Sequence, residues 1–205
     1  MQTLRLLSKS TGAYVMANAI DTLQNLQKDL SSKAKVYTAG AMAESFIRSH
    51  INTGLGMSPL SAATTSYRGQ GKPLEDTGNL RDSITYQVIN ASTATVGTTR
   101  KDAALHNKGG TITAKKNWLF IPAAGTRKLE RTYGKKPGDV LSGLRSNGAS
   151  VFRIGRTVCY SSPDTQGKPK VVYYLKKSVI IPKREFFYLS DYEVKLIMQE
   201  IAPKI

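Results

Sequence analysis

The stretch ITYQVINASTATVG, residues 84–97, decides the fold. In its first half Ile84, Tyr86 and Val88 alternate with polar residues, which is the period of two expected of a half-buried strand. An Asn-Ala-Ser run follows, and its composition is that of a turn. Residues 93–97 then predict the returning strand, so the stretch as a whole predicts an antiparallel hairpin.

Helical patterns precede this hairpin. Apolar residues recur at helical spacing over 13–30 and again over 34–51, and Gly54 supplies a C-terminal stop signal for the second helix. Residues 54–73 are interrupted by Gly and Pro, which predicts a loop. Between loop and hairpin, the cap-type residues at 76 and 77 predict a short helical turn.

Shorter elements follow the hairpin. Residues 103–110 predict a short helix closed by two glycines, and residues 118–121 predict a strand that ends at a proline. Strands are also predicted at 151–154, 157–160, 171–175 and 178–181. A Ser-x-x-Glu capping box at 190–193 begins a last helix, whose apolar face is Val194, Ile197, Met198 and Ile201.

These elements predict an α+β fold. It has N-terminal helices, an antiparallel β-sheet with a long basic β-arm inserted at about 115–175, and a C-terminal helix. We expect a single domain over residues 1–205, because a chain of this length and 40% hydrophobic content can bury one core.

Charge is the strongest compositional signal. The chain carries a net charge of +16, with an isoelectric point of about 10.0. Residues 100–190 hold nineteen basic and five acidic side chains, so nearly all the excess lies in this region. A localised excess of this size implies an acidic partner, which could be nucleic acid, an acidic protein surface or a membrane face.

Other features narrow the class. Cys159 is the single cysteine, which excludes an intrachain disulfide and fits a reducing compartment. The sequence shows no secretory signal and no apolar run of about 18 residues, so we expect no membrane partner.

Reactive groups do not converge in the sequence. His50 and His106 belong to no metal-binding pattern. Glu75 and Asp76 are adjacent and Asp82 lies six residues further on, so these three carboxylates offer only weak support for a catalytic dyad. We therefore expect no enzyme, with no catalytic, cofactor or metal site.

A general nucleic-acid-binding protein is the alternative. Aromatic residues are interleaved with the basic ones, as on single-strand binding surfaces, although their spacing also fits strands packed in a core. They are Trp118, Phe120, Tyr133, Phe152, Tyr160, Tyr173 and Tyr174.

Four motifs, in order, resemble those of the phage virion morphogenesis (tail-completion) proteins of Mu-like and related contractile-tailed phages. The first is Pro-Leu-Ser with a following Thr, at 58–68, and the second is Leu-x-Asp-Thr-Gly-x-Leu-x-x-Ser-Ile, at 74–84. The third is Val-Gly-Thr followed by Ala-x-x-His-x-x-Gly, over 96–110. The fourth is similar to Ile-Pro-Ala-Arg-Pro-Phe-Leu, at 181–190, although Lys183 and Glu185 replace the usual Ala and Pro.

The resemblance implies structural roles for the motif residues. They are Asp76, Thr77, Gly78, Leu80, Ser83, Gly97, His106, Gly109, Gly110, Pro182, Arg184, Phe186 and Phe187. It also implies a subunit of a ring, with sixfold symmetry, that caps the tail tube or joins tail to head. The partners would be other copies of the chain, tail tube or sheath proteins, head connector or neck proteins, and the packaged DNA. The expected location is the head–tail junction of the virion, and the host cytoplasm during assembly. A minor tail or neck protein of another kind would share these features.

From the basic region we hypothesise a surface that faces the DNA channel or an acidic neighbour. Its residues would be Lys115, Lys116, Arg127, Lys128, Arg131, Lys135, Lys136, Arg153 and Arg156.

Overall fold

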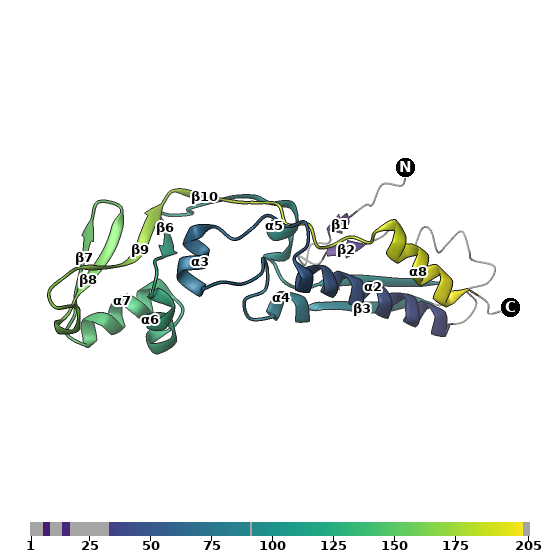
Figure 1. Cartoon of the computed structure of the whole chain (residues 1–205), viewed down its shortest axis with the longest axis horizontal. Helices are drawn as coiled ribbons and strands as arrows, with labels where there is room; N and C mark the ends of the chain where they lie inside the picture. Colours follow the sequence, from purple (N-terminus) through teal and green to yellow (C-terminus); the bar gives the residue numbers. More distant parts are fainter. Residues whose placement is uncertain (1–5, 9–13, 17–32, 91, 203–205) are drawn as a thin grey trace. The chain divides into compact units, whose positions relative to one another are not determined.

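A computed structural model describes residues 6–8, 14–16, 33–90 and 92–202 of the chain (Figure 1). The chain divides into two compact units. Unit 1 comprises residues 1–58, 72–110 and 182–205, and unit 2 comprises residues 59–71 and 111–181. That residues 1–205 act as a single domain stays a prediction. None of the helices in the described ranges is both long and apolar enough to cross a membrane.

Unit 1 is an α+β assembly around one hairpin. The hairpin strands are β3 (Ile84–Asn90) and β4 (Thr93–Thr98), which pair antiparallel with Ile84 opposite Thr98 and Tyr86 opposite Val96. The hairpin predicted from the sequence is thus confirmed. The other elements of unit 1 are β1 (Leu6–Ser8), β2 (Tyr14–Met16), α2 (Lys33–Thr53), α4 (Asn79–Asp82), α5 (Ala103–Lys108) and α8 (Asp191–Ile201).

Helix α2 runs along the hairpin and also packs against α8 (Figure 1). The predicted helix over 34–51 is confirmed, because its apolar stripe forms one buried face that includes Val36, Ala43 and Ile47. Gly54 ends the helix as expected. Its φ is +61°, and its N–H donates to the carbonyl of His50 at 3.0 Å.

Two side chains of α2 also bind the free edge of β3. Glu44 accepts a hydrogen bond from the N–H of Tyr86 at 2.9 Å, and Arg48 donates to the carbonyl of Ile84 at 2.8 Å. Glu44 and Arg48 are themselves an ion pair at 2.8 Å. The pair satisfies backbone groups that would otherwise stand open at the edge of the sheet.

The helix predicted over 13–30 is wrong at its start. Residues 14–16 form strand β2, which pairs antiparallel with β1, and residues 17–30 lie outside the described part of the chain. Tyr14 and Val15 favour strands, and local apolar spacing does not reveal a partner strand eight residues upstream.

The C-terminal helix α8 is confirmed together with its cap. The Ser190 hydroxyl accepts from the N–H of Glu193 at 3.3 Å, and the Glu193 carboxylate accepts from the N–H of Ser190 at 2.8 Å. Ile197 and Ile201 are buried in the core of unit 1, with Val194 and Met198 packed against it.

Unit 2 contains a four-stranded antiparallel sheet in the order β6-β9-β8-β7. A separate pair joins β10 to β5. The strands are β5 (Gly110–Thr113), β6 (Leu119–Pro122), β7 (Ser150–Ile154), β8 (Thr157–Ser161), β9 (Lys170–Lys176) and β10 (Ser178–Ile181). The helices are α3 (Ala62–Arg68), α6 (Thr126–Tyr133), α7 (Pro137–Ser146) and the 3-10 turn η1 (Pro163–Thr165).

Helices α6 and α7 correct the expected β-arm at 115–175. The described residues show no extended arm, because Val140 and Leu144 of α7 are buried against Val158, Val172 and other residues of the sheet. These strands and helices therefore form a core of their own. Strands predicted at 151–154, 157–160, 171–175 and 178–181 are all present.

The loop predicted over 54–73 also contains a helix. Ser61 caps the start of helix α3, where its hydroxyl accepts from the N–H of Thr64 at 3.2 Å, and Gly69 caps its end. It buries none of its own residues and contacts α6, which lies about sixty positions further along the chain. Its support is long-range, so local composition pointed to a loop.

Candidate functional site

The two units differ sharply in charge. Unit 2 holds fifteen Lys and Arg residues against three Asp and Glu residues, a net charge of +12. The rest of the chain supplies only +4 of the total of +16. Thirteen of the fifteen cations in unit 2 are exposed, so the charge excess becomes a surface property of this unit.

All nine basic residues of the predicted surface lie in unit 2. Eight of them are exposed and Arg127 is half-buried. Two of them, Lys115 and Lys116, precede β6. Helix α6 carries Arg127, Lys128 and Arg131, and the link from α6 to α7 carries Lys135 and Lys136. Strand β7 carries Arg153, and the turn after it carries Arg156.

Arg127 has a structural role among them. It donates to the carbonyl of Arg68 at 3.1 Å, and its guanidinium carbon lies 5.9 Å from the centre of the Tyr67 ring. The Tyr67 hydroxyl in turn donates to the Glu130 carboxylate on α6. These contacts hold α3 on α6, so Arg127 supports the unit as well as adding to its charge.

A second group of cations converges on Trp118. The Lys177 ammonium lies 4.3 Å from the centre of the indole ring, and the Arg153 guanidinium carbon lies 5.3 Å from it. Lys177 also donates to the carbonyl of Asn117 at 2.9 Å, and Arg153 donates to the carbonyl of Gly155 at 2.6 Å. Both cations are therefore held at defined positions beside one ring.

Sheet pairing brings two more cations to the same end of the sheet. Lys176 is opposite Leu119, the residue after Trp118. The N–H of Leu175 donates to the carbonyl of Arg156 at 2.8 Å, which ties the β7–β8 turn to the end of β9. We name these residues the Trp118 cluster: Trp118, Arg153, Arg156, Lys176 and Lys177.

The cations of the Trp118 cluster have no ion-pair partner among the described side chains. Of the carboxylates in unit 2, Glu130 accepts from Tyr67 and Asp139 lies beside Gly134. Within the described part of the chain, these four cations are thus grouped without a neighbouring carboxylate to balance their charge. Sequence reasoning named Arg153 and Arg156 but missed Lys176 and Lys177, because only strand pairing places these two residues at the same end of the sheet as Trp118.

The motif residues lie in unit 1, where most of them hold the core together. Leu80 is buried, and the Ser83 and Thr98 hydroxyls are hydrogen-bonded at 2.7 Å. Gly97 pairs with Thr85 in the hairpin. The helical turn at 79–82 is confirmed, but Gly78 rather than an Asp or Thr side chain precedes it, with a φ of +78°. Asp76 and Thr77 are exposed.

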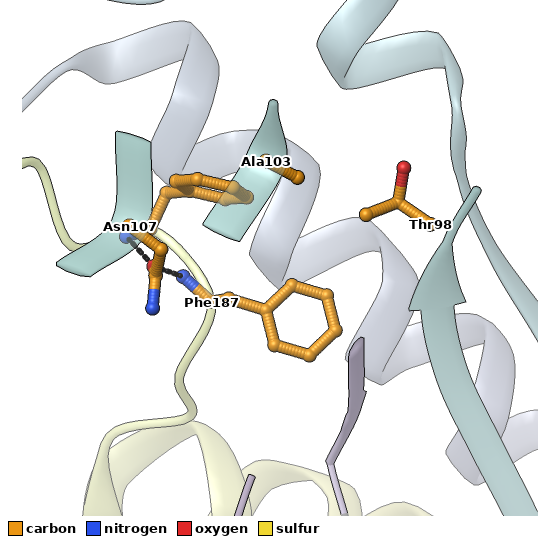
Figure 2. A pocket seen from close by; sticks show the side chains of 5 residues that line it. Thr98, Ala103, Asn107 and Phe187 are labelled. Carbon is orange, nitrogen blue, oxygen red and sulfur yellow. Dashed lines mark hydrogen bonds between the residues drawn. The ribbon is translucent and has the colours of Figure 1, made fainter. Parts of the chain in front are cut away.

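A latch joins helix α5 to the segment before α8. The Asn107 side-chain oxygen accepts from the N–H groups of both Phe186 and Phe187, each at 2.9 Å (Figure 2). The N–H of Arg184 donates to the carbonyl of His106, and its side chain donates to the carbonyl of Ser58, both at 2.9 Å. Asn107 and Arg184 are both buried, so these bonds form away from water.

The rest of the closing motif completes this region. Phe186 and Phe187 are buried in the core with their rings edge to face, and Pro182 is exposed. Gly109 and Gly110 follow α5 with φ values of +71° and +155°, which reverse the chain where other residues would be strained. Sequence reasoning named His106 here, whereas the side chain that makes the latch is its neighbour Asn107.

The His106 side chain takes no part in the latch. Burial lowers the pKa of His106, Asp102 opposes that effect, and Arg184 and Arg100 add to it. Its buried Nδ1 atom has no hydrogen-bond partner among the residues that the structure describes. The imidazole therefore stays neutral at pH 7, and His106 contributes through its backbone carbonyl.

His50 is placed by α2 against the cap of α8. Its Nδ1 contacts the carbonyl of Phe186 at 3.0 Å and its Nε2 contacts the Glu193 carboxylate at 2.8 Å, while Tyr188 stacks on its ring at 4.2 Å. Burial alone would raise the pKa of Glu193, but hydrogen bonds from Ser190 and the contact with His50 lower it overall. This contact joins the two packed helices.

A small cavity lies beside the latch (Figure 2). It is lined by Thr98, Ala103, Asn107, Phe186 and Phe187, and its volume is about 10 Å³. A space of this size can hold one water molecule at most. Within the described ranges, no three His, Cys, Asp or Glu side chains are grouped to hold a metal ion.

The chain matches no protein-family model, no curated protein and no solved structure.

Proposed function

We propose that this chain is a non-enzymatic structural protein of a tailed bacteriophage. It acts at the head–tail junction, as a tail-completion or neck subunit of a closed ring that caps the tail tube and allows the head to join. The ring would be sixfold, in keeping with the family that the motifs resemble.

The observation that carries this proposal is the convergence of the motifs. The segments at 76–83 and 96–110 are separated from the segment at 182–187 by residues 111–181, yet these three segments all lie in unit 1. The first motif, at 58–68, lies almost entirely in unit 2. The Asn107 latch connects the third motif directly to the fourth. This contact between two motifs that are distant in the sequence is consistent with a shared structural role, and it supports the resemblance.

The chemistry of the motif residues supports assembly over catalysis. Leu80, Phe186 and Phe187 are packed in the core, and the polar residues Ser83 and Arg184 bond to other groups of unit 1. Side chains used in this way build a frame rather than react with a substrate. A frame of this kind acts through its surfaces, and copies related by closed symmetry can finish a tubular polymer without chemistry.

Electron microscopy of lysates from a phage that lacks this gene tests the proposal. We expect DNA-filled heads apart from tails, with tails that are unjoined or irregular in length. A plasmid copy of the wild-type gene should restore joined particles. Normal joined virions in the absence of the gene would reject the assembly role.

The charge of unit 2 favours one further candidate, a general nucleic-acid-binding protein. Its net charge of +12 is that of a unit made for a polyanion. Such a protein would bind DNA and RNA of any origin with steeply salt-dependent affinity, and its loss would leave particle assembly intact. The same lysates therefore separate the two candidates.

A further inference from the structure

We infer that the Trp118 cluster is a contact site for the phosphate backbone of double-stranded DNA. The inference rests on the proposed function for the source of that DNA, the duplex that passes the head–tail junction. It goes further in assigning the contact to one end of the sheet of unit 2.

The first argument is the arrangement of charge. Lys177 and Arg153 approach the same indole ring at 4.3 and 5.3 Å, and the backbones of Lys176 and of the turn that carries Arg156 lie at the same end of the sheet. Like charges gathered without a described carboxylate repel one another. A bound polyanion removes that repulsion and releases its own counterions, which is the main source of affinity for DNA.

The second argument is that the cations are already positioned. Lys177 is fixed by the carbonyl of Asn117 and by the indole ring, and Arg153 is fixed by the carbonyl of Gly155 and by the same ring. A long side chain that is held before binding loses less conformational freedom on binding. The indole ring therefore supports two cations, and we expect it to make no contact with the bases of the duplex.

The third argument separates DNA from an acidic protein. Unit 2 has fifteen Lys and Arg residues, of which nine are lysines, and thirteen of the fifteen are exposed. Lysine is depleted at protein–protein interfaces, whereas protein–DNA interfaces are strongly positive throughout. A regular polyphosphate can meet many dispersed cations, and recognition would then be independent of sequence.

The experiment uses Trp118 as a built-in reporter, since it is the single tryptophan of the chain. The full-length protein is titrated with a duplex of random sequence, and Trp118 emission is recorded beside the anisotropy of a labelled duplex. The test variant is R153Q/K177Q. The control is K101Q/K195Q, which removes the same charge from two exposed lysines of unit 1.

We expect wild-type emission to change with the same dissociation constant as the anisotropy. R153Q/K177Q should bind at least roughly tenfold more weakly at low salt, and the slope of log affinity against log salt should fall in magnitude by about 2. K101Q/K195Q should lose less than about twofold, because neither lysine belongs to the Trp118 cluster.

Three results would overturn the inference. Duplex binding without a change in Trp118 emission would place the DNA elsewhere on the protein. Equal losses in the two double variants would show that net charge, not this site, sets the affinity. An emission change with poly-glutamate but not with duplex would assign the cluster to an acidic protein. None of these results alters the particles seen when the gene is absent, so failure here is distinguishable from failure of the proposed function.

Discussion

Substitution of Asn107 by Ala should destabilise unit 1 strongly. The Asn107 side chain is 5% exposed, and its oxygen accepts the N–H groups of both Phe186 and Phe187 at 2.9 Å. Alanine leaves both donors buried and unsatisfied, and each such group costs about 1–3 kcal/mol. We therefore expect a loss of about 2–6 kcal/mol in the free energy of unfolding, measured by urea denaturation. For a chain of this size that corresponds to a fall in Tm on the order of 10 °C.

Asn90 provides a matched control in the same unit. Its side-chain oxygen also accepts a backbone N–H at 2.9 Å, that of Ser92, but Asn90 is exposed. Water can replace its oxygen in Asn90→Ala, so that variant should lose less than about 1 kcal/mol. If Asn107→Ala costs no more than Asn90→Ala, the latch does not stabilise the fold and the reasoning is refuted.

Three other predictions follow from the packing and the titrating groups. A Cβ at Gly143 would lie 2.3 Å from the Tyr133 ring, while a Cβ at Gly138 would meet nothing within 4 Å. In urea unfolding, Gly143→Ala should therefore lower the free energy of unfolding by about 1–2 kcal/mol, and Gly138→Ala should raise it by up to about 1 kcal/mol. A loss of stability in both variants would contradict the packing. Because the pKa of Glu193 is lowered in the folded state, its carboxylate stabilises the fold above about pH 4.5, and this contribution disappears as the pH falls further. Glu193→Gln should therefore flatten the acid side of a curve of stability against pH. An unchanged slope would argue against this role of Glu193. Burial raises the pKa of Tyr173 to about 12, so an ultraviolet titration should show one late tyrosine that is absent in Tyr173→Phe. The Tyr173 hydroxyl has no hydrogen-bond partner in the described ranges, so that variant should change stability by less than about 1 kcal/mol, and a larger loss would reveal a hydrogen bond.

The elements predicted correctly are those whose signals are local. The β3–β4 hairpin follows from alternation around a short turn, and α2 follows from an apolar stripe that spans five turns. Helix α8 follows from the Ser-x-x-Glu pattern at Ser190 and Glu193, whose reciprocal hydrogen bonds cap the start of the helix.

The elements missed depend on distant partners. Helix α7 has only Val140 and Leu144 buried, and their neighbours Val158 and Val172 come from strands further along the chain. With Gly, Lys and Arg around them, two apolar residues do not mark a helix in the sequence. Such short helices exist because the sheet is there to receive them.

The candidate site divides in the same way. The charge of residues 100–190 predicted a basic surface, and all nine named cations lie in unit 2. The grouping of Lys177 and Arg153 around Trp118 was not predictable, because it depends on how the strands that carry these residues pair in the sheet. The role of Asn107 could not be predicted, because the two backbone N–H groups that its side chain binds come from residues far along the chain.

The most direct test of the head–tail role is complementation outside the cell. Heads and tails from a lysate that lacks this chain are mixed with the purified protein, and infectious particles are counted. The account predicts that the wild-type chain restores joined, infectious virions, and that the same chain unfolded by heat before mixing does not. Heads and tails that stay separate in the presence of the folded wild-type chain would contradict the account.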